Sequence, residues 1–334
     1  KNALEPRFLS LPKGCNAFGS RASNQKVDQW ITVWKKAEKN LTFLLVLAGT
    51  KTSEVDGISA AGATPYSRRY TALADAEFLL KGPLSSPTWH LPSLPAGFSP
   101  ALISYVGKQL LNLEPLILSA GLFDSPDFPY VPMEPSDLGP AECLINGKAM
   151  DLHRVRDLWR KGYLRGKAIK EPLLITECVP GGTTTAQAVM TGLGMAVAPL
   201  MGSSVRNPPL EIKEKIVTQG LKAADLGDNP SSQELIAAVG DPFQPIAVGL
   251  LLGAREAGQH VLLGGGSQML AVLALALRTV DIKNRADFLE GVSIATTKWL
   301  ATSSNLSSQG IQSSFLELVS LLEKTFNVST LCFS

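Results

Sequence analysis

The sequence is poor in the residues that build cross-linked or metal-dependent folds. Its 334 residues include only four cysteines, Cys15, Cys143, Cys178 and Cys332, which are widely scattered. This spacing predicts neither a disulfide framework nor a cysteine zinc site, and reduced thiols suit a cytoplasmic protein. Only three histidines occur, none at metal-ligand spacing from a second ligand type. We therefore expect no bound metal.

The sequence also lacks an excess of charge of one sign. Lys and Arg together number 31 and Asp and Glu 29, which leaves a formal net charge of +2. Nucleic-acid-binding proteins usually carry a clear basic excess. Two short basic runs, 34–40 and 154–167, are typical of solvated helix faces, with local anion binding as the alternative. We therefore predict no nucleic-acid partner.

No uninterrupted apolar run is long enough to cross a membrane. The most apolar stretch, 261–277, is interrupted by three glycines, Ser267 and Gln268, whereas a membrane-spanning helix needs about 20 consecutive apolar residues. This pattern predicts a buried strand followed by a buried helix, and no membrane partner. No signal peptide is visible and the first residue is Lys, so we expect the native start to lie upstream.

The sequence does contain short apolar runs that alternate with helical segments. Apolar runs without internal alternation suit strands that are covered on both faces of a sheet. Strands that alternate with helices predict an α/β fold of the Rossmann-like type, with a mainly parallel sheet and helices on both faces. The predicted strands are 42–49, 115–121, 172–178, 260–265 and 292–297, and the predicted helices are 69–80, 185–194, 209–224, 241–258 (capped by Asp241) and 267–280.

The chain divides into one large part and one small part. Residues 41–300 hold all the predicted strands and are interpreted as a Rossmann-like nucleotide-binding domain. The flanking segments, 1–40 and 301–334, are expected to form a small helical subdomain built from both chain ends. The proline-rich segments 81–100 and 123–140 are either pocket lids or plain connectors.

The stretch "TECVPGGTTTAQAV" is the most informative motif, because it follows the predicted strand 172–178. Gly181 and Gly182 let the backbone approach a ligand closely. Thr183 and Thr184 supply hydroxyls and amides at the start of the next helix. Free amides and the positive end of a helix attract anions, of which phosphate is the most common. The turn is therefore predicted to be a phosphate cradle.

A second glycine turn follows the predicted strand 260–265. Gly265 and Gly266 come directly before Ser267, which we expect to cap the next helix. Tight packing of a helix on a strand also selects glycine, so one such turn leaves both explanations open. Two turns at neighbouring strand ends favour a ligand that carries a phosphate. Neither turn has the pattern of a P-loop or of a dinucleotide-binding G-x-G-x-x-G motif.

Two charged residues accompany the predicted cradle. Lys213 falls on the predicted helix 209–224, within reach of a bound anion, although helix lysines commonly serve only solvation. Glu177 lies near the end of strand 172–178, where a carboxylate beside a phosphate is costly unless it bonds sugar hydroxyls or a base. A ribose-containing ligand explains Glu177, and a hydrogen bond to loop amides is the alternative.

Together these motifs resemble the nicotinate-nucleotide:dimethylbenzimidazole phosphoribosyltransferase family, most closely its archaeal and cyanobacterial branch. "TECVPGGTTTAQAVMTGLG" is similar to that family's glutamate, glycine-rich and double-threonine loop, and "LEIKEKI" to its next helix with a phosphate-side lysine, here Lys213. "VGDPFQPIAVGLLLGAREAGQHVLLGGGSQMLAVLALA" is similar to the following helix, strand and glycine turn. "LAGTKTSEVDGISAAGATPYSRRYTA" resembles the loop that lines the base pocket, with Thr64 and Tyr66 at matching positions.

The resemblance implies a Rossmann-like large domain, a small domain of helices from both chain ends, and a homodimer. The implied reaction is attack of a base nitrogen on C1 of nicotinate mononucleotide, with inversion and release of nicotinate, in cobamide lower-ligand assembly. Dimethylbenzimidazole or a purine such as adenine would be the acceptor base, and no metal or cofactor is required. A nucleotide-binding or regulatory homologue without transferase activity is the alternative.

Departures from the family pattern fall on the base and nicotinate contacts rather than on the phosphate contacts. The family's general base is a glutamate in a glycine-rich segment near the C-terminus, which we expect C-terminal to Ser334. Thr296, Thr297 and Lys298 replace a Ser-His-Arg-Ser type motif of the bacterial enzymes. Gly182 stands where those enzymes have Asn.

Overall fold

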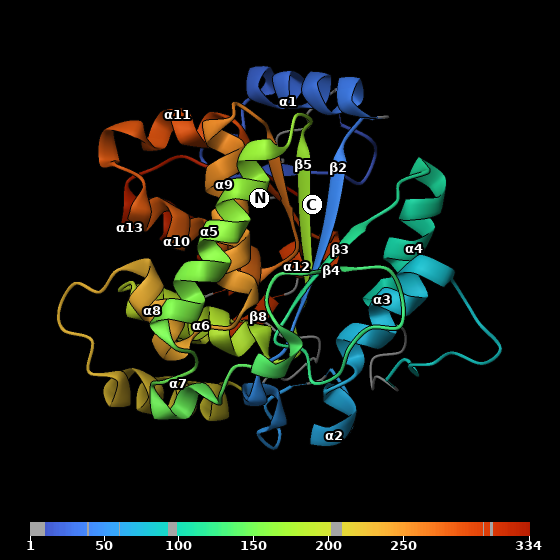
Figure 1. Ribbon diagram of the computed structural model, residues 1–334. Coiled ribbons are helices and arrows are strands. Elements are labelled where there is room, and N and C mark those ends of the chain that lie inside the picture. Colours follow the sequence, from blue (N-terminus) through green and yellow to red (C-terminus); the bar gives the residue numbers. More distant parts are fainter. Residues whose placement is uncertain are drawn as a thin grey trace.

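The described residues form an eight-stranded sheet at the centre of the molecule (Figure 1). The strand order is β1-β10-β7-β6-β5-β2-β3-β4, and neighbouring strands are parallel except for the pair β1 and β10. The predicted α/β fold with a mainly parallel sheet is confirmed. The computed structural model describes residues 11–38, 40–59, 61–92, 99–201, 209–302, 304–307 and 310–334.

All the predicted strands occur, with ends within about two residues of the expected ones, as is usual for strand boundaries. They are β2 (Thr42–Ala48), β3 (Leu116–Ala120), β5 (Leu173–Cys178), β6 (Val261–Gly264) and β7 (Val292–Ala295). Short strands carry no hydrophobic pattern from which to predict them. Those added by the structure are β1 (Ala17–Phe18), β4 (Val131–Pro132), β10 (Cys332–Phe333) and a separate hairpin of β8 (Ser304–Ser307) and β9 (Gly310–Ser313).

The predicted helices occur as α3 (Thr71–Lys81), α6 (Gly182–Gly192), α7 (Leu210–Ala224), α9 (Phe243–Glu256) and α10 (Ser267–Thr279). In the part of the chain that the structure describes, no helix combines the length and apolar character needed to cross a membrane. The other helical elements are α1 (Asn24–Ala37), η1 (Lys51–Glu54), α2 (Pro65–Arg68), α4 (Pro100–Leu111), η2 (Ser136–Leu138), η3 (Leu144–Asn146), α5 (Leu152–Ala168), η4 (Ala198–Leu200), α8 (Ser232–Val239), η5 (Ile282–Asn284), α11 (Arg285–Glu290), α12 (Lys298–Thr302) and α13 (Ser314–Phe326).

Strand β2 shows how the sheet divides the interior into two cores. Successive side chains of a strand point to opposite faces. Leu44 and Val46 lie in the larger core, which includes apolar residues of α5, α9 and α10, whereas Leu45 and Leu47 lie in a smaller core with residues of α3. Figure 1 shows α3 and α4 on one side of the sheet and α5, α9 and α10 on the other. Helices therefore cover both faces, as predicted.

Helices α5 and α9 pack with their backbones close together. A side-chain carbon added to Gly162 or Gly166 on α5 would overlap the carbonyl oxygen of Ile246 or Leu250 on α9. Glycine at these positions therefore serves helix packing, in the way that small residues elsewhere let helices approach closely. Of the two helices, α9 lies directly on the sheet, in contact with β2, β5 and β6.

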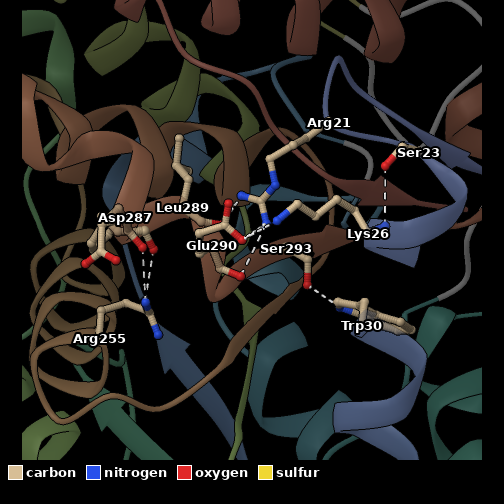
Figure 2. A network of polar contacts seen from close by, with 10 residues as sticks. Arg21, Ser23, Lys26, Trp30, Arg255, Asp287, Leu289, Glu290 and Ser293 are labelled. Carbon is tan, nitrogen blue, oxygen red and sulfur yellow. Dashed lines mark hydrogen bonds and ion pairs between the residues drawn. The ribbon is translucent and has the colours of Figure 1, made fainter. Parts of the chain in front are cut away.

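A polar network fastens the N-terminal segment to the body of the protein (Figure 2). Arg21 and Lys26 both pair with the carboxylate of Glu290, at 3.4 and 2.9 Å, and Trp30 Nε1 donates a hydrogen bond to Ser293 Oγ at 2.7 Å. The contacts join α1 and the preceding loop to α11 and β7, at the sheet edge opposite the carboxyl ends of the strands. Surface ion pairs of this kind contribute little each, and the apolar contacts of α1 add to them.

Both chain ends contribute a strand to the central sheet. β1 pairs antiparallel with β10, and β10 pairs parallel with β7. Helices α1 and α13 come from the two terminal segments that the sequence sets apart, and residues 1–10 of that part lie outside the described chain. The division into a 41–300 domain and an accessory part, 1–40 with 301–334, remains a prediction.

Candidate functional site

The candidate site lies at the carboxyl ends of β2 and β5. From β2 the chain runs outward to β3 and β4, and β5 then pairs with the other edge of β2, so the strand order reverses between them. Ligands of open α/β sheets bind where the loops diverge at such a reversal. The loops after the two strands meet here, since a Cβ added to Gly181 would lie 3.0 Å from the backbone nitrogen of Ser53 in η1.

Gly181 gives the predicted cradle its shape. It precedes α6 with a φ of +84°, a left-handed conformation that favours glycine. Its carbonyl accepts hydrogen bonds from the amides of Thr184 and Thr185, at 3.0 and 3.4 Å. The amides of Gly181 and Thr183 have no hydrogen-bond partner among the described residues. Unpaired amides at the start of a helix are donors that an anion can use.

Lys213 brings a cation to this turn. Its side chain on α7 is 0% exposed, and its Nζ donates a hydrogen bond to Thr183 Oγ1 at 2.8 Å. Within the described chain no carboxylate lies at ion-pair distance, and burial alone lowers the pKa of Lys213 to about 8. A solvating role is therefore excluded. A buried ammonium without a counter-ion is costly, and an anion bound at the turn would offset that cost.

Glu177 lies opposite Val46 of β2, close to the cradle, and remains partly exposed. Burial, followed by the negative charge of Asp241, raises the pKa of Glu177 to about 7. The amide of Val179 donates a hydrogen bond to its carboxylate, which is the loop-amide contact that the sequence left as an alternative. A carboxyl that titrates near neutral pH can also exchange a proton with a bound ligand, so the contact does not exclude a role in binding.

Gly182 and Thr184 are buried under the cradle rather than exposed on it. The amide of Gly182 donates to the carbonyl of Val179 at 2.8 Å, and a Cβ at Gly182 would come 2.7 Å from Nε2 of Gln268. Close packing of α6 on α10 therefore accounts for this glycine. Thr184 Oγ1 has no hydrogen-bond partner within the described chain. Their contact with a ligand stays a prediction.

The second glycine turn is shaped mainly by packing. The amide of Gly265 donates to the carbonyl of Ala295 at 2.9 Å, and a Cβ at Gly266 would lie 2.8 Å from Leu300 Cδ2. The predicted cap at Ser267 is wrong: Gly266 occupies the capping position, and Ser267 is already the first helical residue, with no capping hydrogen bond. Binding of a ligand by Gly265, Gly266 and Ser267 stays a prediction.

The predicted base-pocket residues lie on α2. Thr64 Oγ1 accepts a hydrogen bond from the amide of Ser67 at 3.1 Å, so its hydroxyl caps α2. Tyr66 is 64% exposed, and its ring lies edge-on to Tyr70 with the Arg69 guanidinium 5.7 Å from its centre. An exposed aromatic ring with a cation beside it suits stacking with a planar base.

The segment of α2 reaches the cradle through η1. The buried side chain of Arg68 donates to the carbonyl of Ser53 at 2.8 Å, and Ser53 lies against Gly181. The structure therefore brings the base-pocket segment and the cradle to one edge of the sheet. Binding of a base by Thr64 and Tyr66 stays a prediction.

The residues after β7 lie at the same edge of the sheet. The amide of Thr296 continues the sheet by donating to the carbonyl of Phe333 at 2.9 Å, and Thr297 Oγ1 accepts from the amide of Leu300 at the start of α12. Lys298 is exposed at the start of α12.

The sequence did not reveal the polar residues that connect the helix starts. The predicted N-cap at Asp241 is displaced by one residue, because α9 begins at Phe243 with Pro242 at the N-cap. Asp241 Oδ1 nevertheless accepts a hydrogen bond from the amide of Phe243 at 3.0 Å, and its Oδ2 contacts Thr185 and Gln268. The sequence signal for this network was limited to one polar residue near the start of each helix. Among the described residues no three His, Cys, Asp or Glu side chains gather into a metal site, and the four cysteines are unpaired.

Comparison with known proteins gives close relatives by sequence. No protein-family model matches the chain. A UPF0284 protein of Prochlorococcus marinus strain MIT 9313 is 55% identical over 291 residues, which cover 87% of this chain and 72% of the relative. A UPF0284 protein of Cyanothece sp. strain PCC 7425 is 44% identical over 266 residues, covering 78% of this chain and 70% of the relative.

Two solved structures from Thermus thermophilus share the fold. CobT matches with a TM-score of 0.57 at 17% identity, covering 91% of this chain and 88% of that chain. A nicotinate-nucleotide-dimethylbenzimidazole phosphoribosyltransferase matches with a TM-score of 0.55 at 17% identity, covering 86% of this chain and 82% of that chain. The fold is thus that of the family whose motifs the sequence resembles, whereas fold alone does not determine activity.

Proposed function

We propose that this chain, which belongs to the UPF0284 family, transfers the phosphoribosyl group of nicotinate mononucleotide to a lower-ligand base in cobamide biosynthesis and releases nicotinate. The acceptor is dimethylbenzimidazole or a purine such as adenine. The observation that carries the proposal is the buried Lys213 ammonium, which contacts Thr183 at the start of α6 and has no counter-ion in the described chain. A nucleotide 5′-phosphate would be that counter-ion.

The chemistry suits the arrangement of the site. With the phosphate at the cradle, the ribose would extend toward Glu177, and the exposed ring of Tyr66 would face the base. The base nitrogen attacks C1 of the ribose, the bond from C1 to nicotinate breaks, and the attacking nitrogen loses its proton. Holding both reactants in place supplies much of the rate enhancement. In this proposal the general base is a glutamate beyond Ser334.

Release of nicotinate from nicotinate mononucleotide tests the proposal. The assay offers dimethylbenzimidazole and adenine in parallel to this chain and to a longer form that continues past Ser334. We expect release that depends on an added base, in the longer form at least, because the proposed phosphate site lies within this chain and the proposed general base lies beyond Ser334. No release by either form with any azole or purine would contradict the proposal. Tight nucleotide binding without turnover in the longer form would favour the non-catalytic homologue.

A homodimer is also part of the proposal, with α4 as the contact between the two copies. Ile103 and Leu110 are 72% and 81% exposed on this helix, and Val106 lies between them. The only charged residue of α4, Lys108, is buried and pairs with Glu114 outside the helix. Two copies related by a two-fold axis would therefore bring apolar faces together without opposing charges.

Leu110→Lys is expected to convert the dimer to a monomer at micromolar concentration, because an unpaired charge would be buried at the contact. Light scattering coupled to size-exclusion chromatography measures the mass. Ile282→Lys, at a position 79% exposed in η5, is the matched control and should leave the dimer intact. A wild-type protein that is monomeric at these concentrations would contradict this part of the proposal.

Cytoplasmic localisation belongs to the proposal as well. The four cysteines are unpaired in the structure, and unpaired thiols suit a reducing compartment.

A further inference from the structure

A buried carboxylate contacts three helix starts around the candidate site. Asp241 is 0% exposed, and its Oδ2 accepts hydrogen bonds from Thr185 Oγ1 at 2.5 Å and from Gln268 Nε2 at 2.8 Å. Its Oδ1 accepts from the amides of Phe243 and Gln244, at 3.0 and 3.3 Å. The first turns of α6, α9 and α10 are therefore joined by one side chain.

Gln268 completes this network. Its Oε1 accepts a hydrogen bond from Gln244 Nε2 at 3.1 Å while its Nε2 donates to Asp241. The same amide lies against Gly182, where any side chain would collide with it. The spacing between α6 and α10, and hence between the cradle and the second glycine turn, is set by these contacts.

Joining helices through a fully buried carboxylate carries a free-energy cost, because the charged group loses its contact with water. Burial raises the pKa of Asp241, and its hydrogen-bond donors oppose that rise. Within the described chain no cation pairs with it, although apolar side chains pack helices together without any such penalty. The cost is consistent with a role of Asp241 in the function of the site.

The negative charge of Asp241 also acts on Glu177. The titratable groups that face Glu177 are Asp241 before α9, Asp75 on α3 and the adjacent thiol of Cys178. Asp75 is itself held by Ser99 Oγ at 2.7 Å. After burial, the charge of Asp241 is the next cause of the raised pKa of Glu177, ahead of that of Asp75.

We infer that Asp241 is a positioning residue of the proposed nucleotide site, which holds the phosphate cradle in register with the second glycine turn through Thr185 and Gln268. The inference rests on the proposed function. Asp241 itself touches no ligand in this arrangement. Its second effect is to favour the neutral form of Glu177, so that less negative charge faces the bound phosphate.

The test is the affinity for nicotinate mononucleotide, measured by calorimetry from pH 6 to 9, together with carboxyl NMR titration of Glu177. Asp241→Asn keeps the shape of the side chain but replaces Oδ2 by a donor that faces the donor Nε2 of Gln268. We expect at least a tenfold loss of affinity. We also expect the Glu177 titration to move to lower pH, because a neighbouring negative charge is removed.

The double substitution Asp241→Asn with Gln268→Glu should restore most of the affinity, because the glutamate at position 268 supplies the acceptor and the negative charge that the asparagine at position 241 lacks. Ser232→Ala is the matched control. It removes a buried hydrogen bond from Ser232 Oγ to the carbonyl of Leu275, 2.8 Å long, outside the network. This control should lower stability alone and leave affinity and the Glu177 titration unchanged.

The outcomes separate the two claims. If Asp241→Asn lowers stability but leaves the affinity and the Glu177 titration as in the wild type, Asp241 is merely structural and the inference is wrong. Failure of the double exchange to recover affinity would likewise overturn it. If the wild type binds neither nicotinate mononucleotide nor inorganic phosphate, the proposed function fails, and the inference fails with it.

Discussion

Replacement of Lys213 by methionine is expected to make the ligand-free protein more stable. Burial lowers the pKa of the Lys213 ammonium from its usual 10.5 to about 8. A shift of that size means that the buried, charged ammonium destabilises the folded protein by about 3 kcal/mol at pH 7. Methionine has a similar length and fills the same space without a charge, so chemical denaturation at pH 7 should show an increase of this order in the free energy of unfolding.

The gain should depend on pH in a defined direction. The folded protein disfavours protonated Lys213, so the penalty in the wild type is complete below about pH 8 and fades as the pH rises toward 10.5. The stability of the wild type should therefore rise across this range relative to that of Lys213→Met. Lys215→Met, at an exposed position of the same helix, is the control and should change neither curve. A loss of stability in Lys213→Met would show that Lys213 serves the fold.

The same substitution should remove nucleotide binding. Loss of a charge-assisted hydrogen bond to a phosphate, together with its counter-ion, costs about 3 kcal/mol, or roughly a hundredfold in affinity. Affinity should also fall in the wild type above about pH 8, as Lys213 loses its proton. A more stable but inactive variant is the pattern expected when a residue is kept for function at the expense of stability.

Glu177→Gln is expected to impair binding or turnover and to remove a pH dependence centred near 7. In the wild type the carboxyl of Glu177 is largely neutral below this pH and charged above it. A charged carboxylate beside the cradle repels the phosphate, so wild-type affinity should fall as the pH rises through 7. In Glu177→Gln this fall should disappear, and only the titration of the phosphate and of Lys213 should remain.

The stability of Glu177→Gln gives an independent check. Because the folded-state pKa of Glu177 is raised, the wild-type carboxyl stabilises the fold below its usual pKa of 4.5, and this contribution is lost as the pH rises to about 7. The variant should therefore gain stability relative to the wild type over that interval. Glu214→Gln, at an exposed site on α7, is the control. Kinetics and binding that equal those of the wild type at every pH would remove Glu177 from the site.

The sheet and its main helices could be predicted because local patterns determine them. Strands buried on both faces read as continuous apolar runs, and Leu44 to Leu47 of β2 face both cores as such a run requires. The strands β1 and β10 are too short to show periodicity, so their place in the sheet could not be predicted. Their pairing depends on chain ends that lie far apart in sequence.

The candidate site was predictable where a turn needs glycine and not where distant residues meet. The left-handed Gly181 follows from the motif, and the burial of Lys213 had a sequence signal, because it shares the buried face of α7 with Ile216, Val217 and Gly220. The network of Asp241 and Gln268 had no such signal. These side chains are brought together only by the packing of three helices.

Paired titrations of nicotinate mononucleotide and of nicotinate riboside, which lacks the phosphate, test the phosphate site most directly. Wild-type protein and Lys213→Met are compared at pH 7. The wild type should bind the mononucleotide at least a hundredfold more tightly than the riboside, and Lys213→Met should bind the two alike. Equal affinity of the wild type for both ligands would contradict the assignment of Lys213 and Thr183 as a phosphate site.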